Sequence, residues 1–532
     1  MDYLNTLVTN NAPIHNAVKL IKQLPVTHKL TDMYRRSSKN ELMFIGAATF
    51  LTLYNLSAYI KAKRQRLNLP PTIPFALPIV GHSLYLMYTP SRFLDWCNEK
   101  YGEVYNLNVL GKIITVASGK SAEEALVADQ SDLSLDHGVV RDLLHLDYVF
   151  DEPTMDIGMV VNPSVAKIAI PNSKMPMYVK DIQQGVLNAC DALLNENPTL
   201  IKRPSPFFQN FVAYMSVPSL IGTEFALNTE VIESFAQFTG DVISNVGLFL
   251  VTPTFLHKLV LPYVQSSQKH IDVMVKYVAP VVRERREKMR LAEAAGQEHG
   301  LVENFLQGLI EFVKTDKDGV QSHLSPEQIS QSVLLIAFAS VHTTSMNLSF
   351  CIYWLLARPD LMERLQSEIQ TVLPGDGPVT PEALSKMKFL NNFMREVLRQ
   401  GADKIANGKK AMYDFTFSNG YQVPKGRIIE SSLRQLNFGD NSTRCKIDEM
   451  DPDMSHNKIS TTPGRDFASF GMGKHLCPGR FFAVQEIQMT LVYLLKNYDI
   501  KTANGKRPVP VQSVGGVMAT NCEDPLIFTR KN

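Results

Sequence analysis

One cysteine stands in a short loop whose residue types could hold a metal ion. The ten residues FGMGKHLCPG place Cys477 after Gly471 and Gly473 and before Pro478 and Gly479. Glycines allow left-handed backbone angles or close approach of the main chain to a bulky group. The apolar-periodic stretch FFAVQEIQMTLVYLLKNY follows, so the cysteine lies at or just before a predicted helix N-terminus, where free N–H groups favour thiolate over thiol. The loop therefore predicts a thiolate that could bind a metal or act as a nucleophile.

The spacing of the cysteines along the chain predicts no metal site made of several cysteines. The chain has six cysteines, Cys97, Cys190, Cys351, Cys445, Cys477 and Cys522. No two of them form a C-x-x-C pair, which argues against a disulfide framework and a structural zinc site. Cys477 would therefore act alone as a metal ligand, or as a nucleophile with His475 as its base. The alternative is an ordinary glycine-rich turn that happens to contain a cysteine.

A second group of chemically capable residues lies in the apolar stretch AFASVHTTS. Ala339, His342 and Thr343 are spaced i, i+3 and i+4, so they share one face of a helix. Buried hydroxyl and imidazole groups need hydrogen-bond partners. These side chains therefore either bond back to main-chain carbonyls or belong to a reactive site, and the spacing alone leaves both open.

The element that carries this group is the clearest predicted helix in the chain. Ser325 fits the N-cap, Pro326 the first helical position and Gln328 the capping-box partner, and Pro359 marks the far end. Because residues 333–341 are apolar on every face, the helix either crosses a large core or spans a membrane. The polar residues that follow would lie at mid-bilayer in a membrane span, so we expect a buried core helix.

A third pattern, MREVLRQ, places Glu396 and Arg399 three residues apart on one side of a predicted helix. Residues at that spacing can form an ion pair. Most such pairs are solvated and contribute little, so the pattern gains meaning only from its place between the long helix and the cysteine loop.

The cysteine loop FGMGKHLCPG resembles the haem-binding loop of the cytochrome P-450 family, F-x-x-G-x-[RH]-x-C-x-G. The resemblance implies that Cys477 is the axial thiolate on haem iron, that Phe470 packs near the sulfur and that His475 contacts a haem propionate. An anionic sulfur donates electron density to the iron and favours splitting of an O–O bond. The resemblance also implies that Gly473 and Gly479 let the loop approach the porphyrin, with Gly471 and Ala339 among the cofactor-binding residues.

The stretch around Thr343 resembles the family's oxygen-binding segment, A-G-x-D-T-T. By this resemblance Thr343 steadies bound dioxygen and its protons. Two positions depart from the pattern, because Ser340 replaces the glycine and His342 replaces the acid that feeds protons. Histidine titrates near neutral pH and can carry protons, so His342 is a catalytic candidate beside Thr343. A changed proton relay would also suit isomerisation, dehydration or peroxide-driven oxidation.

Glu396 and Arg399 resemble the family's E-x-x-R helix, in which the ion pair is buried and structural. A further arginine usually joins the pair, and Arg444 is the candidate here. The helix after NPSVAKIAIPN shows no W-x-x-x-R, so the sequence does not name the propionate partner that this helix often supplies.

Composition bounds the class of protein. The chain has 532 residues, of which 45% are apolar and 20% charged, which is the balance of a folded globular protein. The formal net charge is +2, and no basic stripe with interleaved aromatics stands out. Nucleic acid is therefore not an expected partner.

The N-terminal part predicts a membrane anchor. Residues 42–60 contain no charged side chain and precede the basic run KAKRQR, which suits the cytoplasmic face of a bilayer. A buried core helix is the alternative for this segment. Residues 1–41 have no role that the sequence reveals, residues 61–82 form a basic and proline-rich linker, and residues 83–532 form the predicted catalytic domain.

Within that domain the sequence predicts a small β-rich part and then helices. FLDWCNEKYG reads as a helix that ends at Gly102, and the segments 103–109 and 112–118 alternate like two strands joined around Gly111. Helical patterns dominate from about Ala122 onward. The resemblance implies a mainly α fold, a helical prism with a small β-rich lobe and an N-terminal transmembrane helix. The haem would lie between the long helix and the cysteine loop.

The resemblance, which is strongest to fungal membrane-bound members, implies a haem-thiolate monooxygenase. Such an enzyme inserts one oxygen atom of O₂ into a lipophilic substrate, with electrons from NADPH through a separate NADPH-cytochrome P-450 reductase. The expected location is the endoplasmic reticulum membrane, with a single span and a cytosolic catalytic domain. The alternatives are a member with a non-hydroxylating haem reaction, a non-catalytic haem protein and a single-span adaptor that needs no cofactor.

Overall fold

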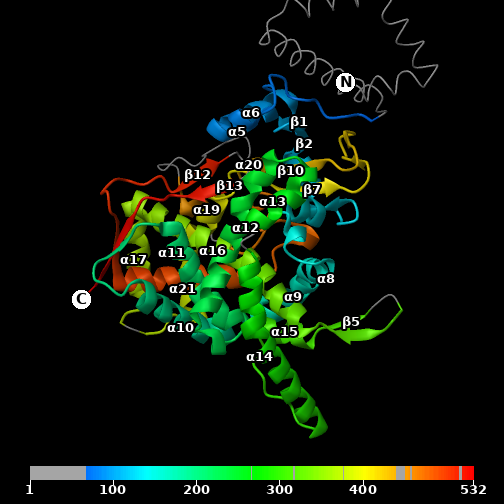
Figure 1. Ribbon diagram of the computed structural model, residues 1–532. Helices are drawn as coiled ribbons and strands as arrows, with labels where there is room; N and C mark the ends of the chain where they lie inside the picture. Colours follow the sequence, from blue (N-terminus) through cyan, green and yellow to red (C-terminus); the bar gives the residue numbers. More distant parts are fainter. Residues whose placement is uncertain are drawn as a thin grey trace, which may run out of the picture. The chain divides into compact units, whose positions relative to one another are not determined.

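The computed structural model describes residues 67–264, 267–315, 318–375, 377–438, 450–455, 458–514 and 518–531. From Leu69 onward they belong to a compact unit that runs from Leu69 to Asn532. The predicted extension 1–41, the predicted anchor 42–60 and Arg444 lie outside the described residues. The unit is mainly helical, as the sequence predicted, with several small sheets (Figure 1).

The helices are α5 Ser83–Tyr88, α6 Pro90–Tyr101, α7 Gly119–Val127, α8 Glu152–Asp156, α9 Asn162–Ala169, α10 Met175–Leu193, α11 Pro204–Leu220, α12 Thr229–Val251, α13 His257–Val264, α14 Gln268–Ala294, α15 Phe305–Glu311, α16 Pro326–Ala357, α17 Pro359–Val372, α18 Pro381–Lys386, α19 Lys388–Gln400, α20 Leu433–Phe438 and α21 Arg480–Asn497. The strands are β1 Val104–Val109, β2 Lys112–Ala117, β3 Leu133–Ser134, β4 Thr199–Ile201, β5 Val313–Thr315, β6 Gln321–His323, β7 Ile405–Ala411, β8 Phe415–Thr416, β9 Gln422–Val423, β10 Ile428–Ser432, β11 Tyr498–Thr502, β12 Val511–Val514, β13 Met518–Asn521 and β14 Leu526–Arg530.

Helix α16 begins where its capping residues predict. The hydroxyl of Ser325 accepts from the backbone N–H of Gln328 at 3.1 Å, and the side chain of Gln328 accepts from the N–H of Ser325 at 2.9 Å. These bonds satisfy two N–H groups that a helix start leaves without partners. The helix ends at Ala357, just before Pro359.

Helix α16 is a core helix. It packs against α11, α12, α14 and α21, and Figure 1 shows it passing through the helical body. Among the described residues it is the one helix long and apolar enough to cross a membrane. Its apolar side chains are instead buried by neighbouring helices, which confirms the predicted core position.

The largest sheet has the strand order β1-β2-β10-β7-β3. β1 and β2 form the predicted antiparallel hairpin, in which Val104 pairs with Ala117 and Gly111 takes φ +81° in the turn. β10 then pairs in parallel with β2 and antiparallel with β7 (Figure 1). β7 and β10 interrupt the helical region that the sequence predicted after Ala122, and they bring a distant segment of the chain to the site.

The segment before α5 belongs to the compact unit. Thr72 bridges to Asn106 of β1, and the side chain of Ile73 is only 2% exposed. The compact unit therefore begins at Leu69, inside the segment 61–82 that the sequence assigned to the linker.

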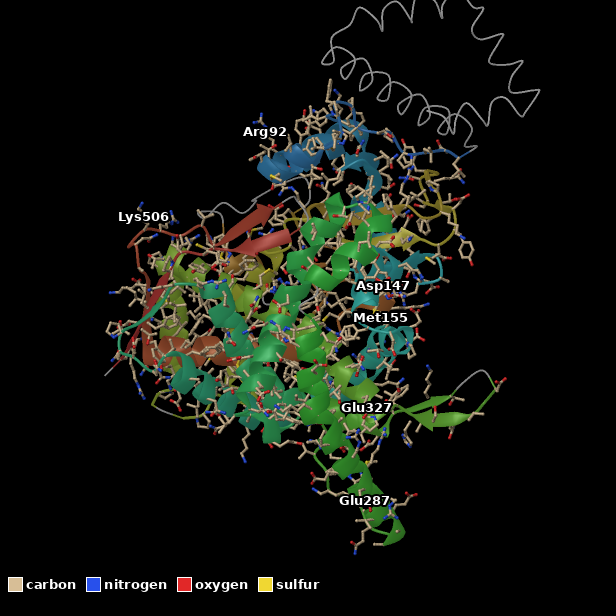
Figure 2. The ribbon with its side chains drawn as sticks, in the orientation of Figure 1. Arg92, Asp147, Met155, Glu287, Glu327 and Lys506 are labelled. Atoms are coloured by element: carbon tan, nitrogen blue, oxygen red, sulfur yellow. The ribbon has the colours of Figure 1, made fainter. Side chains whose placement is uncertain are left out.

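Helix α14 extends beyond the body. Glu287 lies on its projecting part (Figure 2), where it accepts two hydrogen bonds from Arg290, at 2.9 and 2.7 Å. Both side chains are more than half exposed. This pair is a solvated surface contact, away from the core that positions the site.

Candidate active site

A cavity of about 430 Å³ lies between α16 and the cysteine loop. Its wall also includes residues of α9, of the segment that joins α19 to β7, of β7 itself and of the start of α21. The predicted residues that line it are Ala339, Thr343, Phe470, Gly471, His475, Cys477 and Gly479. Gly473 and His342 do not line it. The cavity lies in the usual range for ligand pockets, so two motifs far apart in sequence meet at one concave site.

Two hydrogen bonds and two positive φ angles shape the cysteine loop. The N–H of Gly471 donates to the carbonyl of Ala468 at 2.9 Å, and the N–H of Cys477 donates to the carbonyl of Phe470 at 2.9 Å. Gly471 has φ +77° and Gly473 φ +60°, angles that side chains rarely adopt. A Cβ on Gly473 would also lie 3.0 Å from the Val127 side chain. Both glycines are thus required by the turn itself.

Gly479 has a different reason to be small. Its φ is −82°, which any residue adopts, so its backbone needs no glycine. A Cβ at this position would meet nothing nearer than the Ile170 side chain, at 3.8 Å. Because Gly479 lines the cavity, such a carbon would occupy space in the cavity and strain no neighbour. This matches the expectation that Gly479 lets a bulky group approach.

Cys477 presents its thiol near the start of α21, as predicted. Gly479 is the N-cap of this helix, and the Arg480 guanidinium donates to the carbonyl of Cys477 at 2.8 Å. Burial raises the pKa of the Cys477 thiol above its usual value, while the N–H groups of Gly479 and Arg480 and the Arg480 charge act to lower that pKa. Burial is the larger effect. A metal cation at the sulfur adds the charge that favours thiolate.

His475 and Lys409 converge on one carbonyl. The Nε2 atom of His475 lies 3.1 Å from the Ala128 oxygen, and the Lys409 ammonium donates to Leu126 at 2.9 Å and to Ala128 at 3.3 Å. Burial lowers the pKa of Lys409 to about 8. Burial and the Lys409 charge lower the pKa of His475. The two side chains bring an imidazole and a lysine side-chain nitrogen together at one end of the cavity.

Sequence reasoning did not find Lys409. It is 3% exposed, whereas the side chain of its neighbour Lys410 is 29% exposed and pairs with Asp142 at 2.7 Å. Successive side chains in a strand point to opposite faces, so the pairing of β7 decides which lysine turns inward. The sequence GKK alone carries no such signal.

Helix α16 presents Thr343 but not His342 to the cavity. The Thr343 hydroxyl donates to the carbonyls of Ala339 at 2.9 Å and Ser340 at 3.5 Å. A helix turns about 100° per residue, so His342 lies about 60° from Ala339 on the side away from Thr343. Burial and the charge of Lys404 lower the pKa of His342, and its Nδ1 atom has no hydrogen-bond partner among the described residues. Of the three residues predicted to share one helix face, Ala339 and Thr343 line the cavity and His342 does not.

The Glu396–Arg399 pair is buried and connects to the cysteine loop. The Arg399 guanidinium donates two bonds to the Glu396 carboxylate, at 2.6 and 2.7 Å, and the two side chains are 15% and 4% exposed. Gln400 donates a further bond to Glu396 at 2.9 Å. Arg399 also donates to the Asn437 carbonyl at 3.3 Å, and the Asn437 side chain accepts from the N–H of Ala468 at 2.8 Å. The sequence suggested neither Gln400 nor Asn437 as a partner.

The family model described as Cytochrome P450 matches residues 70–525. The chain belongs to the cytochrome P450 family. It is similar to "Cytochrome P450 monooxygenase 103" of Postia placenta, with 25% identity over 86% of this chain and 94% of the relative. It is also similar to "Cytochrome P450 monooxygenase olcJ" of Penicillium canescens, with 27% identity over 60% of this chain and 61% of the relative. The chain is therefore an oxidoreductase of the monooxygenase type, as the sequence predicted.

P450 enzymes are haem-thiolate proteins, and the residues present fit that cofactor. Cys477 supplies a sulfur donor, and among the described residues no other cysteine lines the cavity. Lys409 and His475 offer cationic or donor groups to two carboxylates, and Gly479 leaves room for a bulky ring. Family membership also implies O₂, a redox partner and lipophilic substrates.

Proposed function

We propose that this P450 inserts one oxygen atom of O₂ into a lipophilic organic substrate, with electrons from NADPH through a separate reductase. One observation carries the proposal: Cys477 and Thr343, from elements far apart in sequence, line the same cavity, whose wall is otherwise largely apolar. An apolar wall both binds an apolar substrate and keeps water from the reacting groups.

Each side chain then has a stated task. Cys477 would bind the iron through its sulfur, and Lys409 and His475 would hold the haem carboxylates. Thr343 holds or moves a proton at its Oγ1 atom. In the structure this hydroxyl donates hydrogen bonds to the carbonyl oxygens of Ala339 and Ser340. When bound, the haem supplies the iron at which O₂ is activated, and thiolate ligation favours cleavage of the O–O bond.

Glu396 and Arg399 are positioning residues in this proposal. The buried ion pair fixes the Arg399 side chain, which donates a hydrogen bond to the Asn437 carbonyl. The Asn437 side chain accepts a hydrogen bond from the N–H of Ala468, just before the cysteine loop. Buried charges that are fully hydrogen-bonded resist displacement, because removal of one partner leaves the other uncompensated. The pair therefore keeps Cys477 in place without contact to the substrate.

The membrane assignment also belongs to this proposal. Residues 42–60 act as a single span in the endoplasmic reticulum membrane and leave the catalytic domain cytosolic. Exposed apolar side chains gather in the first part of the compact unit, at Phe75, Leu77, Ile79, Met87 and Tyr88. Such a patch supports a location close to lipid, where lipophilic substrates collect.

The spectrum of the reduced protein under carbon monoxide tests the haem site. A strongly red-shifted Soret band is expected if the Cys477 thiolate ligates the iron, and Cys477→Ala should abolish it. Cys190→Ala is the control, since that thiol is buried against α21 and away from the cavity. A normal band in Cys477→Ala, or a protein without haem, would contradict the proposal.

NADPH consumption with a reductase and a panel of lipophiles tests the reaction. Oxygenated product that contains one atom from ¹⁸O₂ is expected. Activity confined to small polar compounds would end the proposal for the substrate class. Haem binding without NADPH-dependent turnover of any compound would favour the non-catalytic alternative.

A further inference from the structure

Lys404 is a half-buried lysine, and the described residues offer its side-chain nitrogen no hydrogen-bond or ion-pair partner. It stands just before β7 and lines the cavity that Cys477 and Thr343 share. Its main chain is fixed, because its N–H donates to the carbonyl of Ala402 at 2.8 Å and its carbonyl accepts from Arg434 at 3.1 Å. Burial lowers the pKa of Lys404, and no carboxylate offsets that effect. A lysine in such surroundings gives up its proton more readily, and an anion bound beside it in the cavity would restore its positive charge.

Among the described residues, the cavity wall contains basic side chains and no acidic one. The basic side chains are Lys404, Lys409 and His475. The two carboxylates of a haem have natural partners in Lys409 and His475, which meet at Ala128. Lys404 then remains as a third positive group that the cofactor does not need.

Lys404 lies away from that pair. Five residues along a strand separate it from Lys409, a distance on the order of 15 Å. Its charge acts on His342 of α16, which places its ammonium on the α16 side of the site. Lys404 therefore lines the α16 side of the cavity, and Lys409 lines the part in which His475 lies.

Two hydroxyl groups on α16 add an independent observation. Ser340 and Thr344 also line the cavity, and their oxygen atoms are buried without any hydrogen-bond partner among the described residues. Thr344 is only 2% exposed. Buried hydroxyls in proteins are normally satisfied. A ligand with acceptor oxygens would use these donors together with Lys404.

We propose that Lys404 selects substrates that carry a carboxylate on an apolar skeleton. The ammonium of Lys404 pairs with the carboxylate, and the hydroxyls of Ser340 and Thr344 are further donors on the same wall. The apolar remainder of the cavity holds the skeleton. This inference rests on the proposed function, and it narrows the substrate class from lipophiles in general to lipophilic acids.

Optical titration of the purified holoenzyme tests the inference. The probes are dodecanoic, hexadecanoic and abietic acids, each compared with its own methyl ester, which has the same skeleton without the charge. Binding is read from the change in Soret absorption. The wild type should bind at least one acid about tenfold or more tightly than its ester, which corresponds to about 1.4 kcal/mol.

Three variants assign the preference to Lys404. Lys404→Met keeps the length of the side chain without its charge, and it should bring the acid-to-ester ratio to about one while the ester binds as before. Lys404→Arg should restore the preference. Lys410→Met is the matched control. That lysine lies on β7, the strand that begins just after Lys404, but pairs with Asp142 at 2.7 Å and does not line the cavity, so the preference should persist.

The outcomes separate this inference from the proposed function. Equal affinity for acid and ester in the wild type, failure of every acid to bind, or a preference that survives Lys404→Met would overturn the role of Lys404. Loss of haem from Lys404→Met, measured by pyridine haemochromogen content, would instead assign Lys404 to a haem carboxylate and also overturn it. A wild type without the thiolate band under carbon monoxide would remove the proposed function itself.

Discussion

At the scale of single residues, the site divides into groups that the turn requires and groups that the ligand requires. Gly471 and Gly473 serve the backbone of the cysteine loop through their positive φ angles. Gly479, Lys409 and Thr343 line the cavity, and in the proposed function they serve the haem and the bound oxygen. A substitution in the first class should damage the loop, while a substitution in the second should leave the fold and change binding or chemistry.

Thr343→Ala should lower product formation by about a hundredfold while the carbon monoxide spectrum stays unchanged, because loss of a positioned proton donor costs on that order. Coupled product per NADPH consumed is the measurement. Thr371→Ala is the control, since Thr371 makes the same back-bond, to Ser367 at 2.8 Å, on the exposed surface of α17. Full product yield from Thr343→Ala would assign Thr343 a purely structural role.

Lys409→Met should weaken haem binding by about tenfold to a hundredfold, because one charge-assisted hydrogen bond to a carboxylate is lost. The rate and extent of haem transfer to an excess of apomyoglobin measure this directly. Lys410→Met should retain haem as the wild type does, since its partner Asp142 lies outside the cavity. If both variants transferred haem alike, the assignment of Lys409 to a haem carboxylate would fail.

At the scale of elements, the local signals were sufficient for α16 and the cysteine loop. The Ser325–Gln328 capping box and the glycine spacing act within a few residues, so they can be read from the sequence, and the structure confirms both. Lys404 and Lys409 could not be found in this way. Their orientation depends on how β7 pairs with β10, a contact between distant segments.

The same argument explains His342. Its spacing from Ala339 is compatible with a shared helix face, but the face that lines the cavity is decided by how α16 packs against its neighbours. Thr343 falls on the cavity side of that boundary and His342 does not. Its role as a proton carrier stays a prediction.

A buried glutamate at the contact between α21 and α11 predicts that the stability of the fold depends on pH. Burial raises the pKa of Glu486 to about 8, and the hydroxyl of Ser216 donates to its carboxyl group at 2.8 Å. The folded protein therefore binds a proton that the unfolded chain releases near its ordinary pKa. The stability from this group is complete below that ordinary pKa and is lost as pH rises toward about 8.

Glu486→Gln should remove this loss, so the variant should gain stability over the wild type between pH 5 and 8, by up to about 1.4 kcal/mol per pH unit. Thermal unfolding of the holoenzyme at both pH values is the measurement. Glu287→Gln on the projecting part of α14 should show no such gain (Figure 2). A Glu486→Gln variant that parallels the wild type at both pH values would contradict the proposed titration.

At the scale of the whole molecule, the compact unit begins at Leu69 and contains the whole site. The family model covers nearly the same span, residues 70–525. The unit has its own extensive core, centred on α16 and its neighbours. Every described residue that lines the cavity belongs to this unit.

Removal of residues 1–66 should therefore leave haem binding and the carbon monoxide spectrum intact. The truncated protein should no longer sediment with membranes, because the predicted anchor at 42–60 is gone. A control that lacks only residues 1–41 should still sediment. Loss of haem from the longer truncation would mean that the site depends on the N-terminal residues.

The absence of acidic side chains from the described cavity wall also determines which molecules stay out. A protonated amine that enters finds no aspartate or glutamate on the described wall, and the proposed partners of the two haem carboxylates are Lys409 and His475. Alkaloids and other basic compounds should therefore bind weakly in this pocket, even when their rings are hydrophobic. The pocket excludes by the sign of charge as well as by shape.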